Sequence, residues 1–272
     1  MTEATDHRPF AGKVALVAGA SRGIGAVTAR AFADAGAAVV LAARDEQALG
    51  EVADGIRERG GRALAVRTDV ADAASVEHLV DRAVAEFGRL DAAFNNATDG
   101  PPPTPLADID PADFDRAVAA NVRGTFLGMK YEIQAMLRTG GGTIVNMASL
   151  AGVQGVANLA GYVAGKSGIV GLTKVAALDY ADQGIRVNVV APGPILTYHL
   201  EAAGAEAQRL AGLSTPMRRV GRSEEVADVV LWLSSGQSSF VTGAMIPIDG
   251  GQQAGTKPPQ RYRQGEGMRS PD

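Results

Sequence analysis

Hydrophobic and polar positions follow two alternating patterns along the chain. Short apolar runs rich in β-branched residues alternate with longer Ala- and Leu-rich stretches whose apolar positions recur with a helical period. A helical stretch follows each run except the last. This alternation predicts an α/β fold built from βαβ units around a parallel sheet. The predicted strands are Val14–Ala18, Ala38–Ala42, Ala63–Arg67, Leu90–Asn95, Gly142–Ala148, Ile185–Ala191 and Ala244–Ile248.

Two of the predicted helices are long. One covers Pro111–Arg138 with Asp110 as its N-cap, and the other covers Gly161–Gln183. A third begins after Ser223, where two acidic residues complement the helix dipole. Residues 194–221 contain many apolar side chains but no strand pattern, which predicts a mobile lid over a pocket.

Composition narrows the class of protein. The chain has 272 residues, 46% of them hydrophobic, which is enough for one large core. We expect a single domain over residues 11–255, a polar N-terminal extension at 1–10 outside the core, and a flexible tail at 256–272. The net charge of −4 is spread without a basic block, which excludes a nucleic-acid-binding surface and favours a small-molecule partner.

Several kinds of site are also excluded. The chain has no cysteine, so it has no disulfide, thiolate catalyst or Cys-ligated metal. The histidines His7, His78 and His199 lack metal-ligand spacing, and we interpret them as surface residues; no metal is expected. The N-terminus lacks a signal-peptide pattern, and no apolar run approaches the ~20 residues of a membrane span. We therefore expect a soluble, cytoplasmic protein without membrane contact.

A glycine-rich segment directly follows the first predicted strand and precedes an Ala-rich helix. Its sequence is Gly19-Ala20-Ser21-Arg22-Gly23-Ile24-Gly25. Glycine lets the backbone turn tightly and approach a pyrophosphate, while the helix that follows directs free N–H groups at the anion. The segment indicates a phosphate loop, although a glycine-rich turn without a ligand remains an alternative.

The spacing Gly-x-x-x-Gly-x-Gly, with further motifs in order, resembles the short-chain dehydrogenase/reductase family from about Lys13 to Gly255. The resemblance implies a Rossmann-type, doubly wound, seven-stranded parallel sheet with helices on both faces, an NAD(P)-binding site and a homotetramer. The further motifs are Asn95-Asn96-Ala97, Asn121, Ser149, Tyr162-Val163-Ala164-Gly165-Lys166, Asn188, Pro192-Gly193, Val241-Thr242-Gly243 and Asp249-Gly250-Gly251.

The residues after the second strand favour NADP(H) over NAD(H). Family members that prefer NAD carry an acid where Ala43 stands, and an Arg at the next position, as Arg44, suits a 2′-phosphate. Arg22 could supply a second cation. NAD(H) remains possible if Arg44 is an ordinary surface residue and Asp45 turns onto the ribose. Asp69 either hydrogen-bonds the adenine, as in the family, or caps the next helix.

Tyr162 and Lys166 lie four residues apart in a predicted helix, so their heads share one face. A nearby ammonium favours the ionised form of a phenol, whose ordinary pKa is about 10. The resemblance makes Tyr162 the general acid or base, lets Lys166 also hold the nicotinamide ribose, and places Ser149 on the substrate oxygen. It also makes Asn121 anchor a water in the proton relay. Each residue could instead be structural.

By the same resemblance, the cofactor is bound by residues from every loop at one edge of the sheet. They are Gly19, Ser21, Arg22, Gly23, Ile24, Gly25, Arg44, Asp69, Val70, Asn96, Ala97, Tyr162, Lys166, Pro192, Gly193, Ile195 and Thr197.

One position departs from the family pattern. Thr98 stands where the family has Gly, and a β-branched residue does not tolerate positive φ, so the backbone there must differ. Residues 150–160 contain no charge, which favours a neutral, fairly apolar ketone, quinone or secondary alcohol. Arg218 and Arg219 would alternatively receive an acidic group, or form surface ion pairs.

The leading interpretation is an NADP(H)-dependent oxidoreductase that interconverts a ketone or quinone and a secondary alcohol. One alternative is an NAD-dependent alcohol dehydrogenase of the same family, and another is a catalytically silent dinucleotide-binding regulator. Loss of Tyr162 or Lys166 would have supported the regulator, and both are present. An epimerase or dehydratase would need a larger substrate domain than the about 60 residues after the sixth strand allow.

Overall fold

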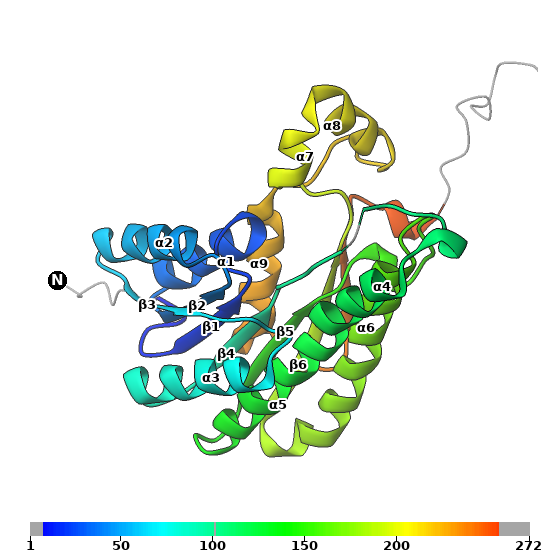
Figure 1. The fold of residues 1–272 in the computed structure, drawn as a ribbon. Coiled ribbons are helices and arrows are strands. Elements are labelled where there is room, and N and C mark those ends of the chain that lie inside the picture. Colours follow the sequence, from blue (N-terminus) through cyan, green and yellow to red (C-terminus); the bar gives the residue numbers. More distant parts are fainter. Residues whose placement is uncertain (1–7, 101, 256–272) are drawn as a thin grey trace, which may run out of the picture.

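The computed structural model describes residues 8–100 and 102–255 (Figure 1). The predicted C-terminal tail and most of the predicted N-terminal extension lie outside the described residues. Seven parallel strands form one sheet in the order β3-β2-β1-β4-β5-β6-β7, which confirms the predicted fold class. The strands are β1 (Val14–Ala18), β2 (Ala38–Ala43), β3 (Arg62–Arg67), β4 (Ala92–Asn95), β5 (Gly142–Met147), β6 (Ile185–Pro192) and β7 (Met245–Ile248).

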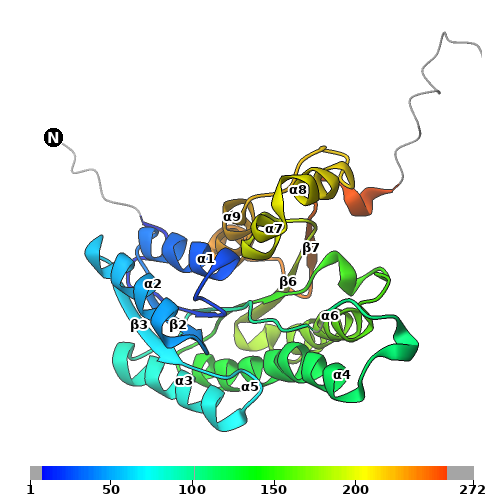
Figure 2. The same cartoon turned by 45° about the horizontal axis from the view of Figure 1, so that its top comes forward.

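Helices cover both faces of the sheet (Figure 2). One face carries α1 (Gly23–Asp34), α2 (Glu46–Glu58) and α9 (Ser223–Ser234), and the other carries α3 (Ala73–Phe87), α4 (Pro111–Val118), α5 (Gly124–Leu137) and α6 (Ala160–Tyr180). The strands at the centre of the sheet are buried from both sides, which is why they read as continuous apolar runs. Two large hydrophobic clusters result, one under each helical layer, and a third, small cluster contains Ala148, Ile169 and Val189.

The lid segment, residues 194–221, folds into two short helices above the carboxyl ends of the strands (Figure 1). They are α7 (Tyr198–Ala202) and α8 (Gly204–Leu213). The lid's predicted mobility stays a prediction. No helix of the described part of the chain is both long and apolar enough to cross a membrane.

The predicted helix Pro111–Arg138 is helical without a break as far as Leu137, but it is not α-helical throughout. Between α4 and α5 the chain makes a π-helical turn over Ala119–Arg123. The turn centres on Asn121, whose side chain is fully buried and whose Nδ2 donates to the carbonyl oxygens of Ala117 and Asp99. A side-chain amide that bonds the carbonyl four residues earlier competes with the helical ladder. The apolar periodicity continues through the turn, so the sequence pattern did not reveal it.

The predicted N-terminal extension is also partly wrong. Phe10 is buried and packs edge-on against Phe32 of α1, with ring centroids 5.1 Å apart. Its backbone N–H donates to the carbonyl of Ala35. Because the residues before Phe10 are mostly polar, the sequence pattern did not indicate that this aromatic side chain belongs to the core.

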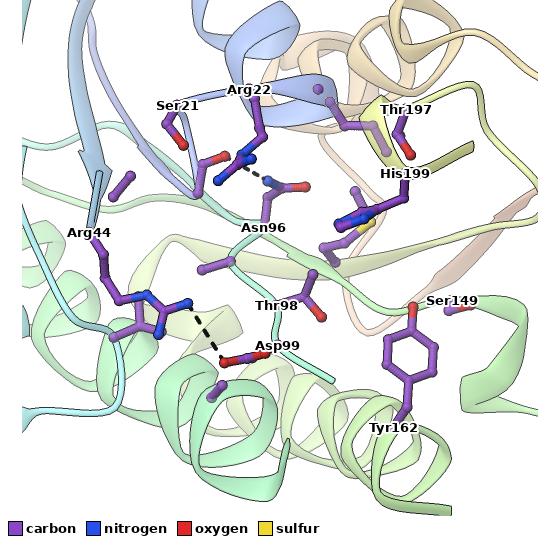
Figure 3. Close-up of a pocket in the computed structure, with 18 of the residues that line it drawn as sticks. Ser21, Arg22, Arg44, Asn96, Thr98, Asp99, Ser149, Tyr162, Thr197 and His199 are labelled. Carbon is purple, nitrogen blue, oxygen red and sulfur yellow. Dashed lines mark hydrogen bonds and ion pairs between the residues drawn. The ribbon is translucent and has the colours of Figure 1, made fainter. Parts of the chain in front are cut away.

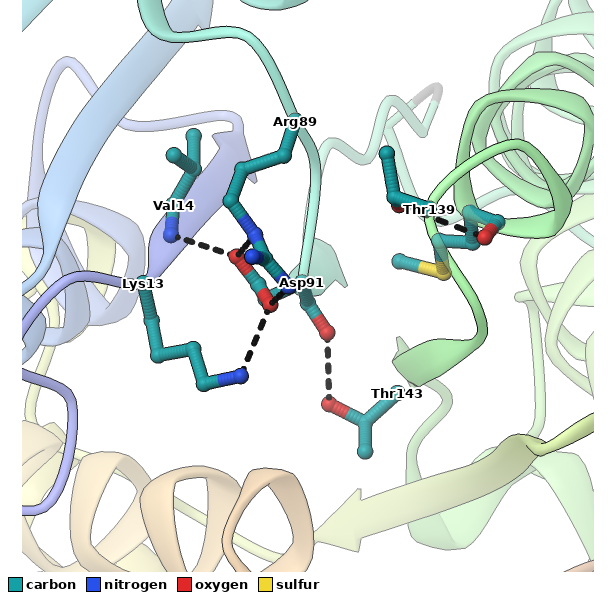
Figure 4. Close-up of polar contacts among 7 residues, drawn as sticks. Lys13, Val14, Arg89, Asp91, Thr139 and Thr143 are labelled. Carbon is teal, nitrogen blue, oxygen red and sulfur yellow. Dashed lines mark hydrogen bonds and ion pairs between the residues drawn. The ribbon is translucent and has the colours of Figure 1, made fainter.

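The amino ends of three strands meet at Asp91, and β4 begins directly after it at Ala92 rather than at the predicted Leu90. The Asp91 carboxylate accepts the backbone N–H of Val14 at 3.0 Å and bonds from Lys13 and Arg89 (Figure 4). Its carbonyl oxygen accepts the N–H of Thr143 at the start of β5. Asp91 therefore fixes the edge of the sheet opposite to the cavity described next.

Candidate active site

A cavity of about 800 Å³ lies at the carboxyl ends of the strands. The predicted cofactor residues line it with one exception, Gly25, and so does Ser149 (Figure 3). Asn121 does not line it either. The lining residues foreseen from the sequence are Gly19, Ser21, Arg22, Gly23, Ile24, Arg44, Asp69, Val70, Asn96, Ala97, Ser149, Tyr162, Lys166, Pro192, Gly193, Ile195 and Thr197.

The loop between β1 and α1 leaves no room for side chains at two of its glycines. Gly19 has φ +74°, and a Cβ there would lie 2.9 Å from the backbone of Ala97. A Cβ on Gly25 would lie 2.1 Å from the carbonyl oxygen of Gly19, so Gly25 packs the helix against the loop instead of lining the cavity. The amide of Asn96 donates to that same carbonyl oxygen at 3.1 Å. The loop is therefore held close to the backbone after β4.

The N-terminus of α1 fits an anion. Its N-cap residue, Arg22, makes no side-chain capping bond, and the first turn contains no acidic residue. The first backbone N–H groups of a helix have no partner within the helix and carry the positive end of its dipole. Because Gly23 and Ile24 line the cavity, these groups could hold the pyrophosphate of a dinucleotide.

Charged side chains line the cavity beyond the ends of β2 and β3. Arg44 forms an ion pair with Asp99, at 3.6 Å between Nη2 and Oδ2. Asp45 caps α2 by accepting the N–H of Ala48, so this carboxylate is already engaged. The alternative that Asp69 caps the next helix is wrong, because Asp72 caps α3.

Asp69 is held in a turn beside the cavity. Its Oδ1 accepts the N–H of Ala71, and its own N–H donates to the hydroxyl of Ser75. Asp69 and Val70 line the cavity, as predicted for cofactor-binding residues, and the contact of Asp69 with the adenine stays a prediction.

Ser149, Tyr162 and Lys166 converge at the other end of the cavity. Tyr162 extends from α6 toward Ser149, which follows β5 (Figure 3). Burial raises the pKa of the Tyr162 phenol, and a hydrogen bond with the Ser149 side chain opposes this rise. Ser149 also accepts the backbone N–H of Ala151. A substrate oxygen placed between these two hydroxyl groups would contact both.

Lys166 is buried, with 1% of its surface exposed, and its Nζ donates to the carbonyl of Met147 at 2.9 Å. The Nζ lies 5.5 Å from the centre of the Tyr162 ring, so the two heads converge as the helical spacing predicts. Burial lowers the pKa of Lys166 to about 7. The sequence-based expectation that the ammonium lowers the phenol pKa is therefore outweighed here, because burial disfavours charge on both groups.

Thr98 takes part in a bond that the family pattern did not suggest. Among the described non-glycine residues, positive φ occurs at Asn158 and Arg218, so Thr98 does not adopt the conformation that a glycine would permit. Its hydroxyl donates to Oδ1 of Asn121 at 2.8 Å. Asn121 is thereby connected to the loop after β4 through both its oxygen and its nitrogen.

A buried polar network lies beneath the catalytic end. Asn95 donates to Glu132 of α5 at 2.9 Å and to Asn146 of β5 at 3.0 Å, and Asn146 donates to Thr173 of α6 at 2.9 Å. Burial raises the pKa of Glu132 to about 7, although the Asn95 hydrogen bond opposes this. The network joins the elements that carry the catalytic candidates.

Sequence reasoning gave some lining residues no binding role. His199 is exposed, as its interpretation as a surface residue predicted, and it also lines the cavity from α7, as does Tyr198. The guanidinium of Arg22 lies 5.6 Å from the ring centre of Tyr198. Asp99, which also lines the cavity, was given no binding role. Both the segment after β6 and the loop after β4 follow the carboxyl end of a strand, where ligands bind in such sheets, and this position could have indicated that they line the site.

The comparisons with known proteins agree with this geometry. Residues 19–253 match the family model described as enoyl-(acyl carrier protein) reductase. The chain is 44% identical over 245 residues to cis-4-hydroxycyclohexanecarboxylate dehydrogenase of Sinomonas cyclohexanicum, covering 90% of this chain and 98% of that protein. It is 43% identical over 242 residues to cyclohexanol dehydrogenase of an Acinetobacter strain, covering 89% and 95%.

The similarity to known proteins also holds for the three-dimensional structure. The crystal structure of levodione reductase superposes with a TM-score of 0.88 at 35% identity and covers 91% of this chain and 100% of that chain. Sequence and structure thus agree over nearly all of the described residues. The chain belongs to the short-chain dehydrogenase/reductase family.

Proposed function

We propose that the chain is an NADP(H)-dependent oxidoreductase that interconverts a ketone or quinone and a secondary alcohol by direct hydride transfer. Family membership implies a nicotinamide dinucleotide cofactor. The observation that carries the proposal is the convergence of Ser149, Tyr162 and Lys166 in the same cavity as the glycine loop. When bound, the nicotinamide supplies or accepts the hydride.

In carbonyl reduction, the Tyr162 O–H gives its proton to the substrate oxygen as the carbonyl carbon receives the hydride. The raised pKa of this phenol keeps it protonated near neutral pH, which suits a proton donor. Ser149 orients the substrate oxygen against Tyr162 and stabilises the charge that develops on it. In alcohol oxidation the same proton returns to the tyrosine oxygen.

Lys166 and Asn121 support this transfer. A buried amine with a pKa near 7 can change its protonation state at neutral pH, so Lys166 is suited to exchange a proton beside Tyr162. We also assign it a bond to the nicotinamide ribose. Asn121 is held by Thr98 and Asp99 directly behind the cavity, where we propose that it positions a water of the proton relay.

The choice of NADP(H) rests on cations at the adenosine end. Arg44 lines the cavity after β2, and Arg22 lines it from the glycine loop. Ala43 offers no carboxylate to a ribose hydroxyl, and the carboxylate of Asp45 caps α2. These contacts support NADP(H) over the alternative, NAD(H).

We propose alicyclic alcohols and ketones as substrates. Two relatives above 40% identity are named for cyclohexane-ring alcohols, one of which also carries a carboxylate. Residues 150–160 carry no charge, and Arg219, a candidate for an acidic group, pairs with Glu225 at 2.7 Å. A neutral ring that carries one hydroxyl or carbonyl group would suit this cavity.

The assembly and location stay predictions. A homotetramer is supported by apolar side chains exposed on α5 and α6, including Phe126, Val175 and Leu178, the last 83% exposed. Light scattering after gel filtration tests it. The cytoplasmic location rests on the sequence alone.

The experiment that tests the proposal compares the wild type with Tyr162→Phe. Both are assayed on a panel of cyclohexanols, cyclohexanones and quinones with each oxidised and reduced dinucleotide. Removal of the phenolic proton is expected to lower kcat by about 10²–10⁴-fold and to leave dinucleotide binding unchanged. Tyr180→Phe, at the far end of the same helix, is the matched control and should keep full turnover. Unchanged turnover in Tyr162→Phe would refute the acid–base role and revive the silent regulator.

A further inference from the structure

We propose that Asp99 limits the preference of this cofactor site for a 2′-phosphate, because its carboxylate competes with that phosphate for Arg44. The inference rests on the proposed function, in which Arg44 meets the adenosine end of the dinucleotide. It adds a specificity-determining residue on a different loop from the one that family patterns use.

The ion pair crosses the cavity. Arg44 follows β2 and Asp99 follows β4, and these strands lie on either side of β1. Adjacent strands are about 4.8 Å apart, so the two backbones are separated by roughly 10 Å, a distance that an extended arginine can span. The pair therefore passes over the carboxyl end of β1, where the glycine loop begins (Figure 3).

Asp99 is the fixed partner. Its side chain is 26% exposed, against 65% for that of Arg44. Its Oδ1 accepts the N–H of Gly100 at 2.9 Å, and its carbonyl oxygen accepts Nδ2 of Asn121 at 2.7 Å. The preceding residue, Thr98, is bonded to the same asparagine. The loop thus holds the carboxylate in the cavity, and Arg44 reaches across to it.

Other charged residues that line the cavity make other contacts, and Asp69 accepts the N–H of Ala71. Arg116 pairs with Asp113 at 2.8 Å, and Asp45 caps α2. Arg22 lies over the ring of Tyr198, nearer the lid. Among the described lining residues, Asp99 is therefore the acid that forms an ion pair with Arg44, the cation assigned to the 2′-phosphate.

The consequence differs between the two cofactors. A 2′-phosphate must draw Arg44 away from Asp99 or accept a carboxylate beside it, and either lowers affinity. NAD(H) has no such phosphate, so Arg44 can remain paired while it binds. Because the pair is partly exposed, we expect an effect of about three- to tenfold on NADP(H) affinity.

The test is direct binding of NADPH and NADH to the full chain, measured by fluorescence titration without substrate. Asp99→Asn removes the charge and keeps the oxygen that accepts the Gly100 N–H. It is expected to lower the Kd for NADPH by about three- to tenfold and to change the Kd for NADH by less than about twofold. In an Arg44→Gln background the same change should have no effect on NADPH binding. Asp81→Asn, an exposed site on α3, controls for net charge.

Two results overturn the inference alone: an equal change for NADPH and NADH, or an Asp99→Asn effect that survives in Arg44→Gln. Failure to bind either dinucleotide overturns the proposed function as well. Loss of the acid–base role in the Tyr162→Phe assay leaves these binding measurements intact. Asp99→Ser, checked by circular dichroism, repeats the test if the first variant does not fold.

Discussion

The end of the cavity that we propose to be catalytic and the end that we propose to bind the adenosine, called here the catalytic end and the adenosine end, are built from different kinds of contact. At the catalytic end, Tyr162 and Lys166 are largely or fully buried and bonded at short range to Ser149 and to the Met147 carbonyl. At the adenosine end, the long, exposed side chain of Arg44 reaches the carboxylate of Asp99, which its loop holds in place, and one ion pair at 3.6 Å joins them. The properties of the catalytic end are determined mainly by burial, and those of the adenosine end by exposed charges.

This difference determines what each end can control. Buried groups feel large desolvation effects, which shift pKa values and hold proton donors in place. Exposed ion pairs contribute little and are weakened by salt. We therefore expect changes at the catalytic end to affect turnover and pH dependence strongly, and changes at the adenosine end to alter affinity by modest factors.

The largest expected effect is that of Lys166→Met on turnover. Removal of the buried amine beside Tyr162 should lower kcat by about 10²–10⁴-fold. Because the folded-state pKa of Lys166 lies below its ordinary value of 10.5, wild-type stability should rise as pH increases from about 7 to 10.5. The variant should lack this rise. Urea unfolding at pH 7 and pH 10, with Lys174→Met on the same helix as control, measures it; the same rise in Lys166→Met would contradict burial as the cause.

The next effect concerns the network beneath the catalytic end. The folded-state pKa of Glu132, about 7, exceeds its ordinary 4.5, so the folded protein retains a proton that the unfolded chain releases. Wild-type stability should therefore fall, by about 3 kcal/mol, as pH rises from 4.5 through 7. Glu132→Gln keeps an acceptor for Asn95 and should remove this fall.

Denaturant unfolding at pH 5 and pH 8 tests the prediction. Glu77→Gln, at an exposed position of α3, is the matched control and should follow the wild type. If Glu132→Gln loses as much stability as the wild type over this range, the carboxyl group is not protonated in the fold. Desolvation would then differ less between the buried and the exposed ends of the cavity.

The smallest effect is expected at the adenosine end. Arg44→Gln should raise the Kd for NADPH by about tenfold, because a charge-assisted bond to phosphate is lost, and should barely change that for NADH. Isothermal titration at low and high salt measures both. Arg116→Gln, which removes a cavity cation already paired with Asp113, should have a smaller effect. Equal losses for both cofactors would place Arg44 away from the 2′-phosphate.

Much of the fold follows from local patterns. Runs such as Val14–Ala18 are apolar at every position because both faces of the strand are covered, and they predict a central parallel strand. The strand ends were correct to within two residues. Gly19 and Gly25 were predicted to allow a tight turn and close approach to a pyrophosphate, and the structure shows that backbone lies where their side chains would be.

Other features were not accessible from local patterns. The π-helical turn at Asn121 depends on bonds to Ala117 and to Asp99, a residue 22 positions away in the chain. Phe10 is buried because α1 brings Phe32 against it. The periodicity of a segment carries no information about such partners, since it reports only which face of an element is apolar.

The sequence alone determined the order of strands and helices, the phosphate loop and the shared helical face of Tyr162 and Lys166, because each depends on spacing within a short segment. Only the tertiary structure decided how deeply those two side chains are buried, that Thr98 bonds Asn121, and that Asp99 meets Arg44. Desolvation and ion pairing depend on which distant segments approach one another, and that is a property of the folded chain.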